Sequence, residues 1–277
     1  MTPVFIKKAS GEQQIFSEDK LRRSLARSGA PENVVDGVLS RITNSLKPGM
    51  STRTIYRQAF SLLKRHSGPA ASRYSLKQAL VELGPSGHPF ERVVGEILRA
   101  RGYEVSVAQV VPGHCVRHEI DVLAQTDDHS IMVECKFHHE RGLSVDVKVA
   151  LYVRARFEDL QKAWEGHVTA ARQFHEAWLV TNARMTTDAT EYSRCVGLKA
   201  LSWDYPPGES LPVLIEQARL HPVTSLTMLS PGQKKQLVAN GFILCTDLTN
   251  QALLEINVTG KKAEQVLKER EEICQPK

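Results

Sequence analysis

Three side chains within a short stretch have the types and spacing of a hydrolytic site. Asp121 lies in the apolar segment EIDVLA, and Glu134 and Lys136 lie two residues apart in the apolar segment SIMVECK. Side chains alternate between the two faces of a strand, so Glu134 and Lys136 point the same way. The polar segment QTDDH between them predicts a hairpin, which brings Asp121 beside Glu134.

Two carboxylates and an amine on apolar strands are costly to bury unless they are paired or bind a metal ion. Mg²⁺ accepts one or two carboxylates and completes its shell with water. A neighbouring lysine can orient or activate the attacking water and stabilise negative charge that develops on phosphorus. The residue types therefore favour metal-assisted hydrolysis.

The spacing D-x(12)-E-C-K resembles the PD-(D/E)XK nuclease superfamily, and most closely the Mrr-type restriction endonuclease domain. The preceding segments fit as well: HPFERVVGEIL predicts an amphipathic helix, and GYEVSV predicts a strand. Ile120 stands where proline often precedes the aspartate. The resemblance implies a restriction-endonuclease-like α/β sheet core, binding of Mg²⁺ or Mn²⁺, and a catalytic set made of Glu91, Asp121, Glu134 and Lys136. It also implies that the metal ligands are Asp121, Glu134 and the carbonyl of Cys135.

A long helix is predicted after this hairpin, from Asp146 to about His175. In the resembled family a helix here lines the active-site cleft, and basic side chains on it meet DNA phosphates. The candidate DNA contacts on it are Lys148, Tyr152, Arg154 and Arg156; a solvated basic helix face is the alternative. Thr181 and Asn182 end the next buried strand, where we expect them to cap the following helix; contact with substrate is the alternative.

The first 84 residues predict a β-hairpin followed by four helices. Residues 6–21 resemble the opening of the ATP-cone, the nucleotide-binding regulatory domain of ribonucleotide reductases. The resemblance implies ATP or dATP as a regulatory ligand, although Ser10 and Gln14 replace residues that are usually acidic. The nucleotide-binding candidates are Lys8, Gly11, Lys20, Arg53 and Arg73. A degenerate cone that only docks or dimerises is the alternative.

Residues 221–277 predict a tail of four short helices. The segment EINVTGKKA resembles a helix-hairpin-helix motif, with Asn257 and Thr259 in the two glycine places. Lys261 and Lys262 supply positive charge at the start of the last helix, where a DNA phosphate would bind. A packing or dimerisation role is the alternative for this tail.

Bulk properties restrict the class of protein. The 277 residues carry a net charge of +5, with 42% hydrophobic and 24% charged residues, as in globular proteins. No apolar run reaches about 18 residues, and the N-terminus lacks the core of a signal peptide, so we expect no membrane association. Five cysteines without a CxxC motif favour reduced thiols in a cytoplasm. Cys115, His118, Cys135 and His138 have zinc-ligand types, but strand alternation argues against a shared site.

Together these features predict a cytoplasmic α/β multidomain protein. It comprises an ATP-cone (1–84), an Mrr-type nuclease domain (85–220) and an all-α helix-hairpin-helix-like tail (221–277). We expect a divalent-metal-dependent DNA endonuclease that ATP or dATP regulates and that acts as a homodimer or higher oligomer. Two alternatives are a nucleotide-sensing DNA-binding regulator with a vestigial nuclease site, and a junction-resolving nuclease.

Overall fold

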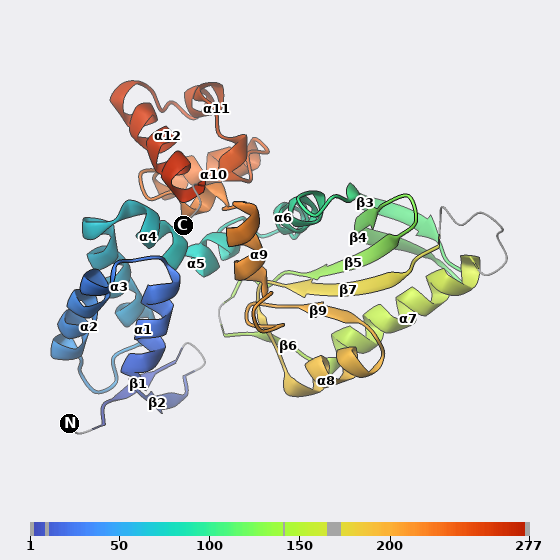
Figure 1. Cartoon of the computed structure of the whole chain (residues 1–277), viewed down its shortest axis with the longest axis horizontal. Coiled ribbons are helices and arrows are strands. Elements are labelled where there is room, and N and C mark those ends of the chain that lie inside the picture. Colours follow the sequence, from blue (N-terminus) through green and yellow to red (C-terminus); the bar gives the residue numbers. More distant parts are fainter. Residues whose placement is uncertain (1–2, 9–10, 141, 165–172, 275–277) are drawn as a thin grey trace. The chain divides into compact units, whose positions relative to one another are not determined.

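The structure is a computed structural model that describes residues 3–8, 11–140, 142–164 and 173–274. The chain folds into two compact units (Figure 1). The first unit combines Met1–Glu82 with His221–Lys277, and the second is the continuous stretch Leu83–Leu220. The predicted three-part division stays a prediction, but the contacts group its first and last parts together.

The first unit begins with a two-stranded antiparallel hairpin of β1 (Phe5–Lys7) and β2 (Gln13–Ile15). Helices α1 (Glu18–Arg27), α2 (Glu32–Ser45) and α3 (Thr52–His66) follow. Ser17 and Ser51 cap α1 and α3 because each side-chain oxygen accepts a bond from a backbone N–H of the first turn. One buried stripe from each helix forms the core of this part, including Leu25, Leu39 and Leu63.

The fourth predicted helix of this part is two helices, α4 (Gly68–Tyr74) and α5 (Leu76–Val81). The break falls at Ser75, whose side chain donates to the carbonyl of Ser72 (2.8 Å). A serine hydroxyl that bonds the backbone in this way competes with the helical pattern. The hairpin is therefore followed by five helices in the described residues up to Glu82, rather than four.

The C-terminal part of this unit contains α10 (Pro231–Ala239), α11 (Asn250–Glu255) and α12 (Gly260–Cys274), with short 3₁₀ turns at Val223–Ser225 and Cys245–Asp247. Helix α12 packs on α4. Glu269, 5% exposed, accepts bonds from the Ser72 hydroxyl (3.0 Å) and from the backbone N–H groups of Thr227 (2.8 Å) and Met228 (3.1 Å). One buried carboxylate thus ties three segments of the unit together.

The second unit is a five-stranded mixed sheet with the order β3-β4-β5-β7-β9. Strands β3 (Glu104–Pro112), β4 (Arg117–Gln125) and β5 (Ser130–Lys136) are antiparallel neighbours. Strands β7 (Glu176–Thr181) and β9 (Lys199–Leu201) continue the sheet in parallel with β5. A further small sheet pairs β6 (Ser144–Val145) with β8 (Arg184–Met185).

Four helices accompany this sheet: α6 (His88–Arg99), α7 (Val147–Trp164), α8 (Thr187–Cys195) and α9 (Leu211–Ala218). Helix α6 packs on β3 and β4, and α7 packs on β7 and α8 (Figure 1). The central strand β5 is apolar because both of its faces are covered; Ile131, Met132 and Val133 are fully buried. The described part of α7 ends at Trp164, and residues 173–175 are not helical, so the helix does not reach His175 as predicted.

Candidate active site

The candidate catalytic residues lie where β4 and β5 separate. The last paired residues of the two strands are Val122 and Val133, so Asp121 and Glu134 face each other one step beyond the ladder. The Asp121 carboxylate accepts a bond from the backbone N–H of Cys135 (2.6 Å). The predicted hairpin thus brings the two carboxylates together at the end of the shared ladder.

Glu134 is held by an arginine from another element. The guanidinium of Arg156, on α7, donates from Nη1 to Glu134 Oε2 and from Nη2 to the carbonyl of Glu119 on β4. Arg156 is 8% exposed, so it does not stand on a solvated face of α7 with the other basic candidates. The structure places this predicted DNA contact against the carboxylate pair instead.

Glu91 approaches the site from the first turn of α6. Its carboxylate is within hydrogen-bond distance of His88 Nδ1 (3.1 Å), and this bond raises the pKa of His88. Burial is the main reason that the pKa of Asp121 is raised, and the negative charge of Glu91 raises it further. The catalytic role of Glu91 stays a prediction.

Lys136 is exposed at the end of β5, where the backbone is fixed by β7. The Thr181 hydroxyl donates to the Lys136 carbonyl (2.6 Å). The Asn182 amide donates to the His138 carbonyl (2.8 Å) and accepts from its N–H (2.8 Å). The expected capping role of these two residues is wrong, because Thr186 caps α8. They instead fix the chain where it leaves the site.

The two central carboxyl groups are more easily protonated than usual. Burial raises the pKa of Glu134 to about 7, with a further contribution from the Asp121 charge that Arg156 opposes. Burial likewise raises the pKa of Asp121, and the Cys135 N–H bond opposes it. A cation bound between the two groups would remove this electrostatic cost.

The donor set fits a hard divalent cation. In the described parts of the chain, no group of three or more His, Cys, Asp or Glu side chains is arranged to hold a metal ion. Mg²⁺ does not need such a group, because one or two carboxylates with water suffice. Asp121 and Glu134 supply the carboxylates, and Cys135, whose carbonyl is the third predicted ligand, follows Glu134 on β5.

Two of the four residues with zinc-ligand types, Cys115 and His118, are bonded by a carboxylate. Asp159, on α7, pairs with His118 Nε2 (2.7 Å) and accepts from the backbone N–H of Cys115 (2.8 Å). The His118 bond holds the pKa of Asp159 well below its usual range. A Cβ at Gly113 would collide with an Asp159 carboxylate oxygen and with the backbone carbonyl oxygen of Val116, so only glycine fits this turn. Asp159 thus fastens the β3–β4 turn to α7.

The other DNA candidates are dispersed. On α7, Lys148 and Tyr152 are exposed, whereas Arg154 bonds Glu158 (2.7 Å) and the Val196 carbonyl (3.1 Å). In the first unit, Lys261 and Lys262 are exposed in the first turn of α12. Lys262 donates to the Gln233 side chain (2.9 Å).

The nucleotide candidates fall into two groups. Lys8 follows β1 and pairs with Glu12 (2.8 Å) across the turn that Gly11 makes at φ 88°. The backbones of Lys7 and Ser51 form an isolated parallel β-bridge. The end of β1 therefore lies beside the first turn of α3, which carries Arg53. Lys20 is exposed in the first turn of α1. Arg73 lies elsewhere and donates to the carbonyls of Glu272 (3.0 Å) and Ile273 (3.3 Å) in α12.

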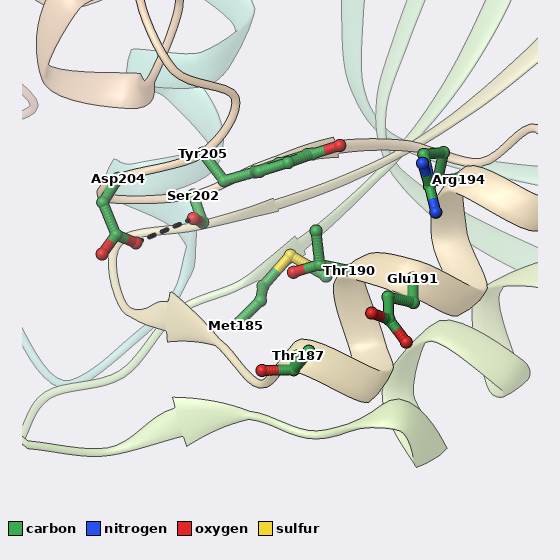
Figure 2. A pocket seen from close by; sticks show the side chains of 8 residues that line it. All are labelled: Met185, Thr187, Thr190, Glu191, Arg194, Ser202, Asp204 and Tyr205. Carbon is green, nitrogen blue, oxygen red and sulfur yellow. Dashed lines mark hydrogen bonds between the residues drawn. The ribbon is translucent and has the colours of Figure 1, made fainter.

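A separate cavity of about 520 Å³ lies in the second unit between β8, α8 and the segment after β9 (Figure 2). Ser202 and Asp204 bond each other on its wall (3.5 Å), and Asp204 also pairs with Arg184 (2.9 Å). None of the candidate catalytic residues lines it. The lining residues are Met185, Thr187, Thr190, Glu191, Arg194, Ser202, Asp204 and Tyr205.

Comparison with known proteins identifies the domain that carries these residues. A restriction endonuclease family model (the Mrr catalytic domain) matches residues 84–202, so the second unit carries a restriction-endonuclease-like domain. A second model, AF1548-like, C-terminal, matches residues 221–274. An uncharacterized protein of Archaeoglobus fulgidus is 33% identical over 183 residues, which cover 65% of this chain and 99% of that protein. The chain belongs to the AF1548-like family.

Two solved structures are similar. The crystal structure of AF1548, a protein of unknown function, has 33% identity and a TM-score of 0.54, and covers 68% of this chain and 98% of that one. The MspJI restriction endonuclease in complex with a 27-mer oligonucleotide is more distant, with 13% identity, a TM-score of 0.35, and coverage of 72% of this chain and 39% of that one.

Among the helices of the described residues, none combines the length and the apolar character that a membrane span requires.

The raised pKa of Glu134 predicts a pH-dependent stability of the metal-free protein. The folded state holds the Glu134 proton more tightly than the unfolded state, so this group's contribution to stability falls as pH rises from about 4.5 to about 7. The loss is on the order of 3 kcal/mol. Thermal melts in EDTA at pH 5 and pH 8 should show a smaller loss for Glu134→Gln than for wild type. An equal loss in both proteins would contradict the assignment.

Proposed function

We propose that this protein is a divalent-metal-dependent DNA endonuclease that hydrolyses phosphodiester bonds. One observation carries the proposal: Asp121 and Glu134 face each other beyond the β4–β5 ladder, with Lys136 two residues further, inside a stretch that matches a restriction endonuclease model. Burying both carboxylates costs free energy, which the Cys135 N–H at Asp121 and the Arg156 guanidinium at Glu134 offset only in part, since burial remains the largest effect on both pKa values.

In this proposal each residue has a defined task. Asp121, Glu134 and the Cys135 carbonyl bind Mg²⁺ or Mn²⁺, and Glu91 supports their arrangement from α6. When bound, the cation supplies charge stabilisation at the phosphate and lowers the pKa of water. Lys136 orients the attacking water and stabilises charge on the phosphate. Lys148, Tyr152 and Arg154 are proposed to contact the DNA backbone from α7.

The substrate and assembly are also part of the proposal. Lys261 and Lys262 lie at the N-terminus of α12, a position that favours a phosphate, and we assign them to DNA binding. One site cuts one strand, so cleavage of both strands would use a homodimer or a higher oligomer.

Plasmid cleavage tests the nuclease proposal directly. Wild-type protein should nick supercoiled DNA with Mg²⁺ or Mn²⁺ and should be inactive in EDTA. Lys136→Ala should lose this activity while it still binds DNA. Failure of wild type to cleave with any of these metals, with DNA binding intact, would favour a DNA-binding regulator. Preferential cutting of four-way junctions would instead favour a resolvase.

Regulation by ATP or dATP is assigned to the first 84 residues, with an ATP-cone as the proposed domain. Lys8 and Arg53 belong to adjoining backbone segments, and Gly11 forms the turn beside Lys8. Lysines at a turn and near a helix start favour a triphosphate. Arg73 is the weaker candidate, because its guanidinium bonds α12.

Lys8→Ala combined with Lys20→Ala should weaken ATP binding at least about tenfold, because two phosphate-directed charges are lost. Isothermal titration calorimetry with ATP measures the effect. Lys47→Ala, an exposed lysine of the same unit, serves as the matched control. Unchanged affinity in the double variant would refute the assignment of these lysines.

A further inference from the structure

Arg156 joins three elements at the candidate site. Its guanidinium bonds Glu134 on β5 and the Glu119 carbonyl on β4, and its Cζ lies 5.3 Å from the centre of the Tyr152 ring, one turn earlier on α7. A guanidinium is planar and offers its donors in a fixed fork. Two acceptors and a ring therefore set both its position and its plane.

Stability alone does not account for an arginine at this place. A buried ion pair often contributes no more than an apolar pair of similar volume. Moreover, Arg156 Nε is buried without a hydrogen-bond partner in the described part of the structure, which adds a cost. An arginine with one donor left unused is better explained by what it does to Glu134.

Helix α7, which carries Arg156, is also bonded to β4 through Asp159. Asp159, three residues later on α7, bonds His118 on β4 (2.7 Å) and the backbone N–H of Cys115 in the turn before it (2.8 Å). Asp159 and Arg156 thus connect α7 to β4 at two places. The guanidinium cannot shift far from Glu134 unless one of these connections breaks.

We propose that Arg156 is a positioning residue, which holds Oε2 of Glu134 and leaves Oε1 for the cation that Glu134 and Asp121 share. The proposal deepens the nuclease function and rests on it. It assigns Arg156 to metal binding through Glu134 rather than to direct contact with a DNA phosphate. Residues that orient a metal ligand in this way typically change metal affinity by roughly 10- to 100-fold when they are replaced.

Mn²⁺ titration of the full-length protein without DNA tests the proposal. Arg156→Gln should weaken Mn²⁺ binding at least about tenfold, measured by calorimetry on protein whose melting shows that it is folded. Arg156→Lys keeps the charge but not the fork, so its affinity should fall between those of Arg156→Gln and wild type. Arg184→Gln removes an exposed guanidinium of the same unit and should bind Mn²⁺ as wild type does.

The possible results of the Mn²⁺ titration distinguish the positioning role of Arg156 from the proposed nuclease function. Equal Mn²⁺ affinity in Arg156→Gln and wild type would overturn the positioning role and leave the nuclease function standing. Tighter binding in Arg156→Gln would also overturn it, because Arg156 would then be a cation substitute that competes with the metal. Wild-type protein that neither binds Mn²⁺ nor cleaves DNA would overturn the proposed function, and this inference with it.

Discussion

The Asp121→Asn protein is expected to cleave supercoiled plasmid at least about a thousandfold more slowly than wild type. Asparagine keeps the shape of the side chain and an oxygen for the Cys135 N–H, so the local backbone should hold. It removes the negative charge that a divalent cation requires, and the loss of such stabilisation amounts to several kcal/mol, or about three powers of ten in rate. Initial nicking rates at saturating Mg²⁺ measure the effect.

DNA affinity is the companion measurement for this variant. Removing a negative charge near the phosphates should leave binding within a few-fold, as fluorescence anisotropy with a short duplex would show. Asp127→Asn, in the exposed β4–β5 turn, is the matched control and should cleave normally. Wild-type cleavage by Asp121→Asn would show that the nuclease site has been assigned to the wrong residues.

Glu269→Ala is expected to destabilise the first unit by about 3 kcal/mol. The change leaves the Ser72 hydroxyl and the N–H groups of Thr227 and Met228 without their acceptor. Each buried polar group left unsatisfied costs about 1–3 kcal/mol, and water that enters the space recovers part of the total. Urea unfolding, together with hydrogen exchange at the Thr227 and Met228 amides, would measure the loss.

Two related variants give this prediction its controls. Glu264→Ala lies on the exposed side of α12 and should change stability by less than about 0.5 kcal/mol. Glu269→Gln keeps one acceptor oxygen and should cost less than Glu269→Ala. If Glu269→Ala were as stable as wild type, α12 would not be held on α4 by this carboxylate.

The sequence predicted the local part of the site well. The alternation of strand side chains and one short turn are enough to bring Asp121 beside Glu134, and the structure has this arrangement. The α/β core with its restriction-endonuclease-like character is likewise confirmed. The arrangement of Asp121 and Glu134 depends on neighbouring segments of the chain, where strand and hairpin geometry leaves few choices, whereas the sheet core is expected from the family resemblance.

The partners supplied by distant elements could not be predicted in the same way. Arg156 is predicted as a DNA contact because basic side chains on this helix meet DNA phosphates in the resembled family, but its guanidinium bonds Glu134, 22 residues earlier in the chain. Glu269 was not singled out at all, since its partner Ser72 lies 197 positions away. Neither contact leaves a periodic signal, because each depends on how whole elements pack.

The grouping of both chain ends into one unit has a consequence for biosynthesis. The restriction-endonuclease-like unit is an insertion: the chain leaves the first unit after Glu82 and returns at His221. Near these crossing points, the Thr224 hydroxyl donates to the Ala79 carbonyl (2.7 Å). On the ribosome, the inserted unit emerges whole before α12 has been made. The restriction-endonuclease-like unit can therefore fold first, whereas the first unit is completed only after its last helix emerges.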